Sequence, residues 1–127
     1  MLIDDYFQQI ESLIAEHINL VESSLIKDKR STHIGIIEGV LSFRNDSVLN
    51  FIEFVNVKEA VLIYKYSYHY QDPHGKLIFR YDMAPHHREV DTFPHHKHIL
   101  PNKVVSSSPP DLAQVLDEID DIIEQSL

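Results

Sequence analysis

The chain has 127 residues, no cysteine and a formal net charge of −9 at pH 7. The lack of cysteine excludes disulfides, thiolate metal sites and thiol nucleophiles, and the acidic balance argues against a general nucleic-acid coat. Because 43% of the residues are apolar, we expect one globular domain over residues 1–127. No apolar run approaches the roughly 18 residues that a membrane helix needs, and the start of the chain lacks the basic region of a secretory signal. We therefore expect a cytoplasmic protein with no membrane partner.

The first predicted element is a helix over residues 2–26. Its apolar side chains recur at steps of three and four, which places them on one helical face: Ile3, Phe7, Ile10, Ile14, Ile18, Val21 and Leu25.

The middle of the chain changes to a strand pattern. Ranges rich in β-branched and aromatic residues, separated by turns, predict strands over 34–43, 47–55, 61–70 and 76–83. The short connections indicate an antiparallel meander. A further short edge strand is expected at 98–100, followed by a loop at 106–108.

A last helix is predicted to begin at Ser108, where a serine, two prolines and an acid are typical of a helix N-terminus. Its apolar stripe is Leu112, Val115, Leu116, Ile119 and Ile122 or Ile123. The predicted fold class is thus α+β, an antiparallel four- to five-stranded meander sheet with an N-terminal and a C-terminal helix packed on one face.

Polar and aromatic residues within the predicted strands leave several interpretations open. Glu38 and Glu53 are expected to face solvent, although Glu53 could orient an imidazole if it faced Arg80. Arg80 could hold a phosphate or form an ion pair with Asp82 or Glu53. Alternating tyrosines either stack bases or, as we favour, cover one face of the sheet beneath a helix: Tyr64, Tyr66, Tyr68 and Tyr70.

The segment 81–98 is the most distinctive part of the chain. It lies in the one basic region, since residues 58–103 carry seven Lys or Arg against five Asp or Glu. Imidazole titrates near neutral pH and can exchange protons, bind metal or bind phosphate. Neighbouring side chains on an extended chain face opposite ways, so not all of its histidines can line one pocket. Five of the nine histidines fall here within thirteen residues: His86, His87, His95, His96 and His98.

Three interpretations of this segment remain. In the first, one imidazole takes the proton of an RNA 2′-hydroxyl, a second protonates the leaving oxygen, and a cation steadies the phosphate without any metal. In the second, His96 and His98 bind a metal that His86 or His87 completes, although no recognised metal spacing is present. In the third, the segment is a noncatalytic loop that contacts a partner.

Three short runs appear in a fixed order before the acidic C-terminal helix: Phe79-Arg80-Tyr81-Asp82, Ala84-Pro85-His86-His87 and Phe93-Pro94-His95-His96-Lys97-His98. This ordered set resembles the TumE-type toxins of prokaryotic toxin–antitoxin modules. The resemblance implies a cytoplasmic growth-inhibiting protein that is neutralised by a cognate antitoxin protein, usually one with a helix-turn-helix DNA-binding domain.

We therefore expect a toxin that acts on RNA as a ribonuclease through a histidine-rich site at one end of the sheet, with no cofactor. A partner-docking module and a histidine-ligated metal-binding protein are the alternatives. A homodimer formed through an edge strand is also expected. The catalytic candidates are His86, His87, His96, His98 and, as an orienting group, Asp82; the substrate-binding candidates are Arg80, Tyr81, Arg88 and Lys97.

Overall fold

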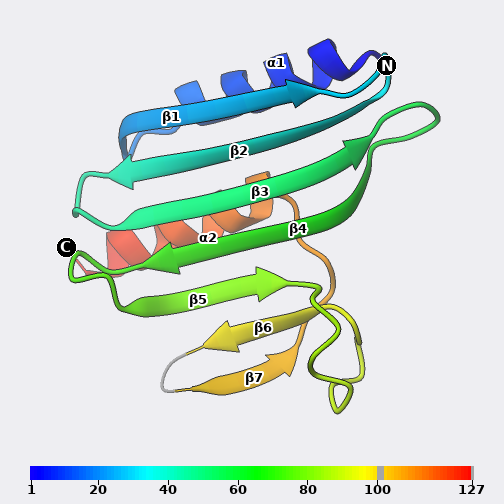
Figure 1. Cartoon of the computed structure of the whole chain (residues 1–127). Helices are drawn as coiled ribbons and strands as arrows, with labels where there is room; N and C mark the ends of the chain where they lie inside the picture. Colours follow the sequence, from blue (N-terminus) through cyan, green and yellow to red (C-terminus); the bar gives the residue numbers. More distant parts are fainter. Residues whose placement is uncertain (100–101, 127) are drawn as a thin grey trace.

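The computed structural model describes residues 1–99 and 102–126, which form two helices and one seven-stranded sheet. The strands pair antiparallel in chain order, so the sheet is an uninterrupted meander. Figure 1 shows both helices on the same side of this sheet. The α+β class and the antiparallel meander are confirmed, but the expected four or five strands are seven. The elements are α1 (Ile3–Ala15), β1 (Leu20–Lys29), β2 (Ile34–Phe43), β3 (Val48–Asn56), β4 (Leu62–Gln71), β5 (Leu77–Asp82), β6 (His96–Ile99), β7 (Lys103–Ser106) and α2 (Leu112–Gln125).

The first helix is shorter than predicted. It ends at Ala15, and residues 20–26 of the predicted helix belong to strand β1. The step of three and four continues past Ala15, but the first two of those later side chains do not enter the core: Ile18 is 86% exposed and Val21 is 69% exposed. Leu25 packs against the core, but it does so from strand β1. Strand β1 pairs with β2 along its whole length. The pairing of β1 with β2 thus outweighs a local spacing of apolar residues that is typical of a helix.

The C-terminal part of the sheet also differs from the prediction. The predicted edge strand at 98–100 is β6, which is an inner strand because β7 pairs with its outer side; Leu100 lies outside the described residues. Strand β7 was not predicted, because four residues are too few to show a period; only its last residue, Ser106, falls in the loop expected at 106–108. Helix α2 starts three residues later than expected, because the N-cap is Asp111, which forms a capping box with Gln114.

The helices bury one face of the sheet. Leu41, Leu49 and Tyr68 from the strands pack there with Ile14 of α1 and Leu116 of α2. The alternate side chains of β2 to β6 point away from the helices, and we call this side the open face. Within the described residues, no helix is long and apolar enough to cross a membrane.

The tyrosine row of β4 divides between the two faces. Tyr66, Tyr68 and Tyr70 are buried beneath the helices, so the packing interpretation is confirmed for these three. A bulge between the pairs Phe54–Lys65 and Val55–Ile63 leaves Tyr64 without a ladder partner. Tyr64 is 43% exposed and its ring packs against Phe54, so the prediction of four tyrosines on one face was wrong for Tyr64.

The two strand carboxylates also differ. Glu38 is exposed as expected, whereas Glu53 is fully buried and faces neither solvent nor Arg80. The hydroxyls of Tyr6 and Tyr68 each donate a hydrogen bond of 2.5 Å to its carboxyl oxygens. These two donors explain how a strand interior can hold a carboxyl group beneath α1.

Candidate functional site

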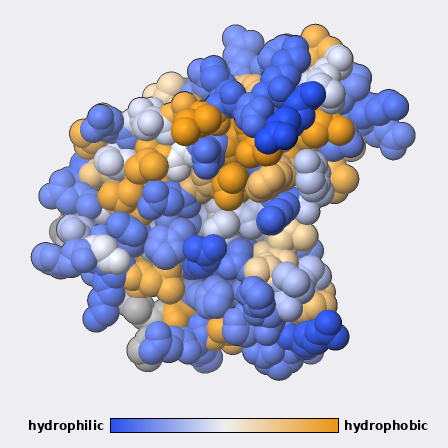
Figure 2. Space-filling view, viewed as in Figure 1, coloured by the Kyte–Doolittle hydropathy of each residue, from blue (hydrophilic) through white to orange (hydrophobic). Residues whose placement is uncertain are grey.

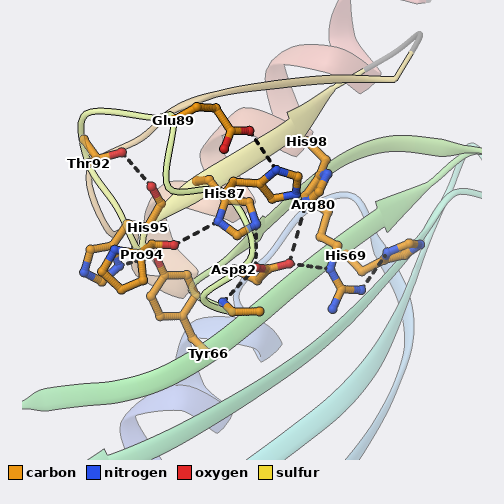
Figure 3. A network of polar contacts seen from close by, with 12 residues as sticks. Tyr66, His69, Arg80, Asp82, His87, Glu89, Thr92, Pro94, His95 and His98 are labelled. Atoms are coloured by element: carbon orange, nitrogen blue, oxygen red, sulfur yellow. Dashed lines mark hydrogen bonds and ion pairs between the residues drawn. The ribbon is translucent and has the colours of Figure 1, made fainter.

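The register of β4, β5 and β6 gathers polar side chains on the open face. Arg80 lies opposite His69 on β4 and His98 on β6. Asp82 lies opposite His96. Directly opposite residues on antiparallel strands have neighbouring side chains, so three short segments of chain build one cluster (Figure 3).

Asp82 is the centre of this cluster. One carboxylate oxygen accepts from Nε of Arg80 at 2.8 Å, and the other contacts Nε2 of His96 at 2.8 Å and the backbone N–H of Ala84 at 3.1 Å. Burial raises the pKa of Asp82, but the hydrogen bonds from Arg80 and Ala84 and the charges of His96 and Arg80 outweigh it. The net pKa lies below the ordinary value, so Asp82 is anionic at neutral pH.

His96 is held from both sides. Its Nδ1 lies 2.9 Å from the carbonyl oxygen of Pro94, and its Nε2 contacts Asp82. These two contacts hold the imidazole ring in one orientation. Because its side chain is also almost completely buried, His96 is a fixed part of the site.

His87 and His98 lie beside His96 with access to solvent. The three ring centroids are 4.8 to 5.3 Å apart. Nδ1 of His87 lies 3.0 Å from the carboxylate of Glu89, which orients the ring. Burial lowers the pKa of His98; Asp82 opposes this, and the neighbouring His96, His87 and Arg80 add to it, so the pKa lies below its ordinary value. His98 is therefore neutral at pH 7 and able to accept a proton.

His69 belongs to the cluster although it was not among the candidates. The guanidinium of Arg80 donates to Nδ1 of His69 at 3.3 Å, so this nitrogen is unprotonated. Burial and the charge of Arg80 lower the pKa of His69, which keeps its ring neutral. The register between β4 and β5 places His69 beside Arg80, and the sequence does not determine that register.

Other candidates lie outside the cluster. Lys97 and Tyr81 face the helices, where both contact Glu118 of α2. His86 and Arg88 are exposed, and Arg88 lies over the ring of Phe93.

His95 points away from the neighbouring His96, as expected for an extended chain. Its ring stacks on Tyr66, whose hydroxyl forms a hydrogen bond of 2.9 Å with Nδ1 of His95. Burial, together with the charges of Asp82 and Tyr81, raises the pKa of Tyr66 to about 12, so this hydroxyl stays protonated at neutral pH. His95 therefore anchors the segment between β5 and β6.

Two hollows on the open face meet at Arg80. The first, of about 560 Å³, extends across β1 to β5 and includes Glu38, Asn50, His69 and Arg80 in its lining. The second, of about 440 Å³, lies between β3, β4 and the segment after β5. In Figure 2 the surface is indented between the β3–β4 end of the sheet and this segment. There is therefore open space on both sides of Arg80.

The cluster also contains a possible metal ligand set. His87, His96 and His98 each offer one nitrogen, and these atoms lie within 4.8 Å of one another. To bind a metal, His96 would have to release Asp82, because its other nitrogen is held by Pro94. The charge of Arg80, which is bonded to the same aspartate, also opposes a cation here.

The comparisons with known proteins agree with the resemblance seen in the sequence. No curated protein and no solved structure matches the chain significantly. A family model described as Toxin TumE matches residues 10–127, which include all seven strands, α2 and the whole cluster around Asp82. The chain therefore belongs to the TumE toxin family.

Proposed function

We propose that this toxin is a cytoplasmic ribonuclease that cleaves RNA by metal-free acid–base catalysis on the open face. The observation that carries the proposal is the convergence of His87, His98 and Arg80 around the Asp82–His96 pair, at the meeting point of two hollows. Transesterification of RNA needs a base, an acid and a cation that stabilises the phosphorane. The cluster supplies each of them.

His98 is the proposed base and His87 the proposed acid. Neutral His98 removes the proton of the 2′-hydroxyl, whose oxygen attacks the adjacent phosphorus. The bond from phosphorus to the 5′ oxygen breaks, and protonated His87 donates its proton to that oxygen. The products are a 2′,3′-cyclic phosphate and a 5′-hydroxyl, so atoms and charge balance without an added water.

Arg80 is the proposed phosphate contact. Its guanidinium has five N–H donors, of which Asp82 and His69 engage two. The remaining donors can reach phosphate oxygens, while both partners hold the planar group in place. Asp82 and His96 act as positioning residues beneath it.

The other sequence candidates take different parts in this proposal. Lys97 and Tyr81 both form hydrogen bonds with Glu118 on the helix side. The sequence predicted Lys97 as a phosphate contact; we assign that contact to Arg80 instead. His86 and Arg88 are exposed in the segment after β5. We assign them to contacts with RNA beyond the scissile bond.

The proposed partners follow from the family and the fold. A toxin of this family has a cognate antitoxin as its protein partner, and RNA is the proposed substrate. The homodimer expected from edge pairing would use β1 or β7, which form the edges of the described sheet. The charged side chains Lys27, Asp28 and Lys29 along β1 disfavour that edge, so a dimer through β7 is the version we propose.

Metal-dependent hydrolysis is the second candidate, because three imidazole nitrogens converge. The chemistry of the product ends separates the two mechanisms. Attack by the 2′-oxygen gives a 2′,3′-cyclic phosphate, and a 2′-deoxy nucleotide at the cleavage position blocks the reaction. A metal-bound hydroxide would cut the deoxy substrate as well, and it would leave a linear phosphate.

The experiment is mass spectrometry of the fragments from a short RNA that the purified, antitoxin-free toxin has cleaved, next to the same RNA with the deoxy substitution. Cyclic ends together with an uncut deoxy substrate are the expected result. Linear phosphate ends with cleavage of the deoxy substrate would replace the proposal by the metal mechanism.

A further inference from the structure

The second hollow on the open face has no part in the acid–base steps. It has a volume of about 440 Å³, and its lining is mostly apolar. Its lining includes two neighbouring aromatic residues, the half-buried Phe54 and the exposed Tyr64, together with Lys65 and the site residues Arg80 and Asp82.

The aromatic pair does not serve the protein core. Tyr64 leaves the helix-covered face at the β4 bulge, whereas the core of β4 is formed by Tyr66, Tyr68 and Tyr70. The rings of Tyr64 and Phe54 lie 6.2 Å apart at 60°. An aromatic surface of this kind, left partly open to solvent, can stack a planar ligand.

The hollow also carries positive charge in the right place for a nucleotide. Nζ of Lys65 lies 5.2 Å from the centroid of the Phe54 ring, and among the described residues Lys65 forms no ion pair. Arg80 lies on the wall shared with the catalytic cluster. A ligand with a planar ring and an attached anion would therefore match both the aromatic pair and the two cations.

We propose that this hollow binds the base of the unpaired nucleotide next to the scissile phosphate of single-stranded RNA. Tyr64 stacks on the base, and Lys65 contacts the backbone phosphate on the outer side. The inference rests on the proposed ribonuclease function, because it takes the phosphate at Arg80 as its anchor. The base must be unpaired, since a base within a duplex cannot offer its face to a side chain.

The first hollow fits this role less well. Its lining includes Glu38, Asn50 and Gln71, and Phe51 is its aromatic residue. Phe51 is buried in the core, and the carboxylate of Glu38 would repel a nucleic-acid backbone. The aromatic hollow is thus the better base site of the two.

Binding of an uncleavable single-stranded oligonucleotide, 2′-deoxy throughout and labelled for fluorescence anisotropy, tests the inference. Tyr64→Ala is expected to weaken binding by about 5- to 150-fold, the range measured when one stacked base is lost. Tyr64→Phe keeps the ring and is expected to bind within about twofold of the unmodified protein. Val21→Ala, an exposed change on β1, is the matched surface control and should bind unchanged.

The outcomes separate the inference from the ribonuclease proposal. Dependence on Tyr64 supports the base subsite even if no RNA is cleaved, in which case the catalytic roles alone fail. Equal affinity of Tyr64→Ala and unmodified protein overturns the subsite even if RNA is cleaved. If the unmodified protein does not bind the oligonucleotide at all, the subsite is likewise overturned. Thermal melting of each variant excludes misfolding as the cause, and because Tyr64 is partly exposed each variant should melt as the unmodified protein does.

Discussion

Asp82 connects the parts of the site at the scale of single residues. It holds Arg80 through one oxygen and His96 through the other, and it contacts His98 at 3.8 Å. One buried carboxylate therefore positions the proposed phosphate contact and the buried ring beside which the proposed base and acid lie.

Replacement of the proposed base or acid tests these assignments. His98→Ala and His87→Ala should each lower kcat/KM for RNA cleavage by about 10²- to 10⁴-fold, the usual contribution of one acid–base group. His74→Ala, in the exposed turn between β4 and β5, is the matched control and should cleave normally. Activity of the two site variants at the level of the control would refute the assignments.

The pH dependence of cleavage follows from the lowered pKa of His98. The base must be neutral, so kcat/KM rises as the pH passes through its pKa. We expect this rise below about pH 6.5, the ordinary value for histidine. The charge of Asp82 raises the pKa of His98, so Asp82→Asn should lower that pKa further. The increase of kcat/KM with pH should then occur at still lower pH, and the maximal rate should fall. A rise above pH 6.5 in the unmodified protein would contradict His98 as the base.

Glu53 provides a test of stability that is separate from catalysis. Burial raises the pKa of Glu53, hydrogen bonds from Tyr6 and Tyr68 oppose this, and Asp111 adds to it, with a net increase. The folded state therefore favours the protonated carboxyl group, and the stability that this gives is lost as the pH rises from the unfolded pKa towards the folded one.

We expect the free energy of unfolding of the unmodified protein to fall relative to that of Glu53→Gln as the pH is raised from 5 to 8. The neutral amide can pair with both tyrosine hydroxyls and does not titrate. Urea denaturation at several pH values measures this difference. Parallel pH curves for the two proteins would show that Glu53 does not titrate in this range.

Strand β6 shows how one element serves two purposes. His96 and His98 point to the open face and build the site, while Lys97 between them points to α2, where its ammonium lies 2.8 Å from Glu118 and 4.7 Å from the centroid of the Tyr81 ring. The alternation of a strand thus attaches the edge that carries the histidine cluster to the C-terminal helix.

Removal of the charge at Lys97 distinguishes this structural role from the phosphate role expected from the sequence. Lys97→Met should lower the free energy of unfolding by about 1 kcal/mol, because one partly buried ion pair and its contact with an aromatic ring are lost. Its affinity for the uncleavable oligonucleotide should change less than twofold. Arg80→Met is the matched variant on the open face and should bind about tenfold more weakly. If Lys97→Met weakened oligonucleotide binding and Arg80→Met did not, Lys97 rather than Arg80 would be the phosphate contact.

Individual elements differ in how far the sequence could predict them. Strands β2 to β5 were predicted because alternation, β-branched residues and strong turns such as 72–75 act together over short distances. Strand β1 was predicted as helix because its apolar residues continue the spacing of α1, and only pairing with β2 reveals it. The hairpin of β6 and β7 is too short for its period to be recognised.

At the scale of the whole molecule, the sheet separates stability from function. The helices and the aromatic core cover one face, while the cluster and both hollows occupy the other. The density of histidines in the sequence pointed to the segment that supplies His87, His96 and His98 to the cluster. The sequence could not predict which histidines meet, because that depends on the register between β4, β5 and β6 and on the path of residues 83–95, as the placement of His69, His86 and His95 shows.

The measurement that tests the central claim most directly is cleavage of a defined single-stranded RNA by the purified, antitoxin-free toxin, with and without EDTA, beside His98→Ala and His74→Ala. The account predicts equal cleavage in both conditions for the unmodified protein and for His74→Ala, and cleavage at least about 100-fold slower for His98→Ala. Cleavage that EDTA abolishes, or that His98→Ala retains at the rate of His74→Ala, would contradict metal-free catalysis by this histidine cluster.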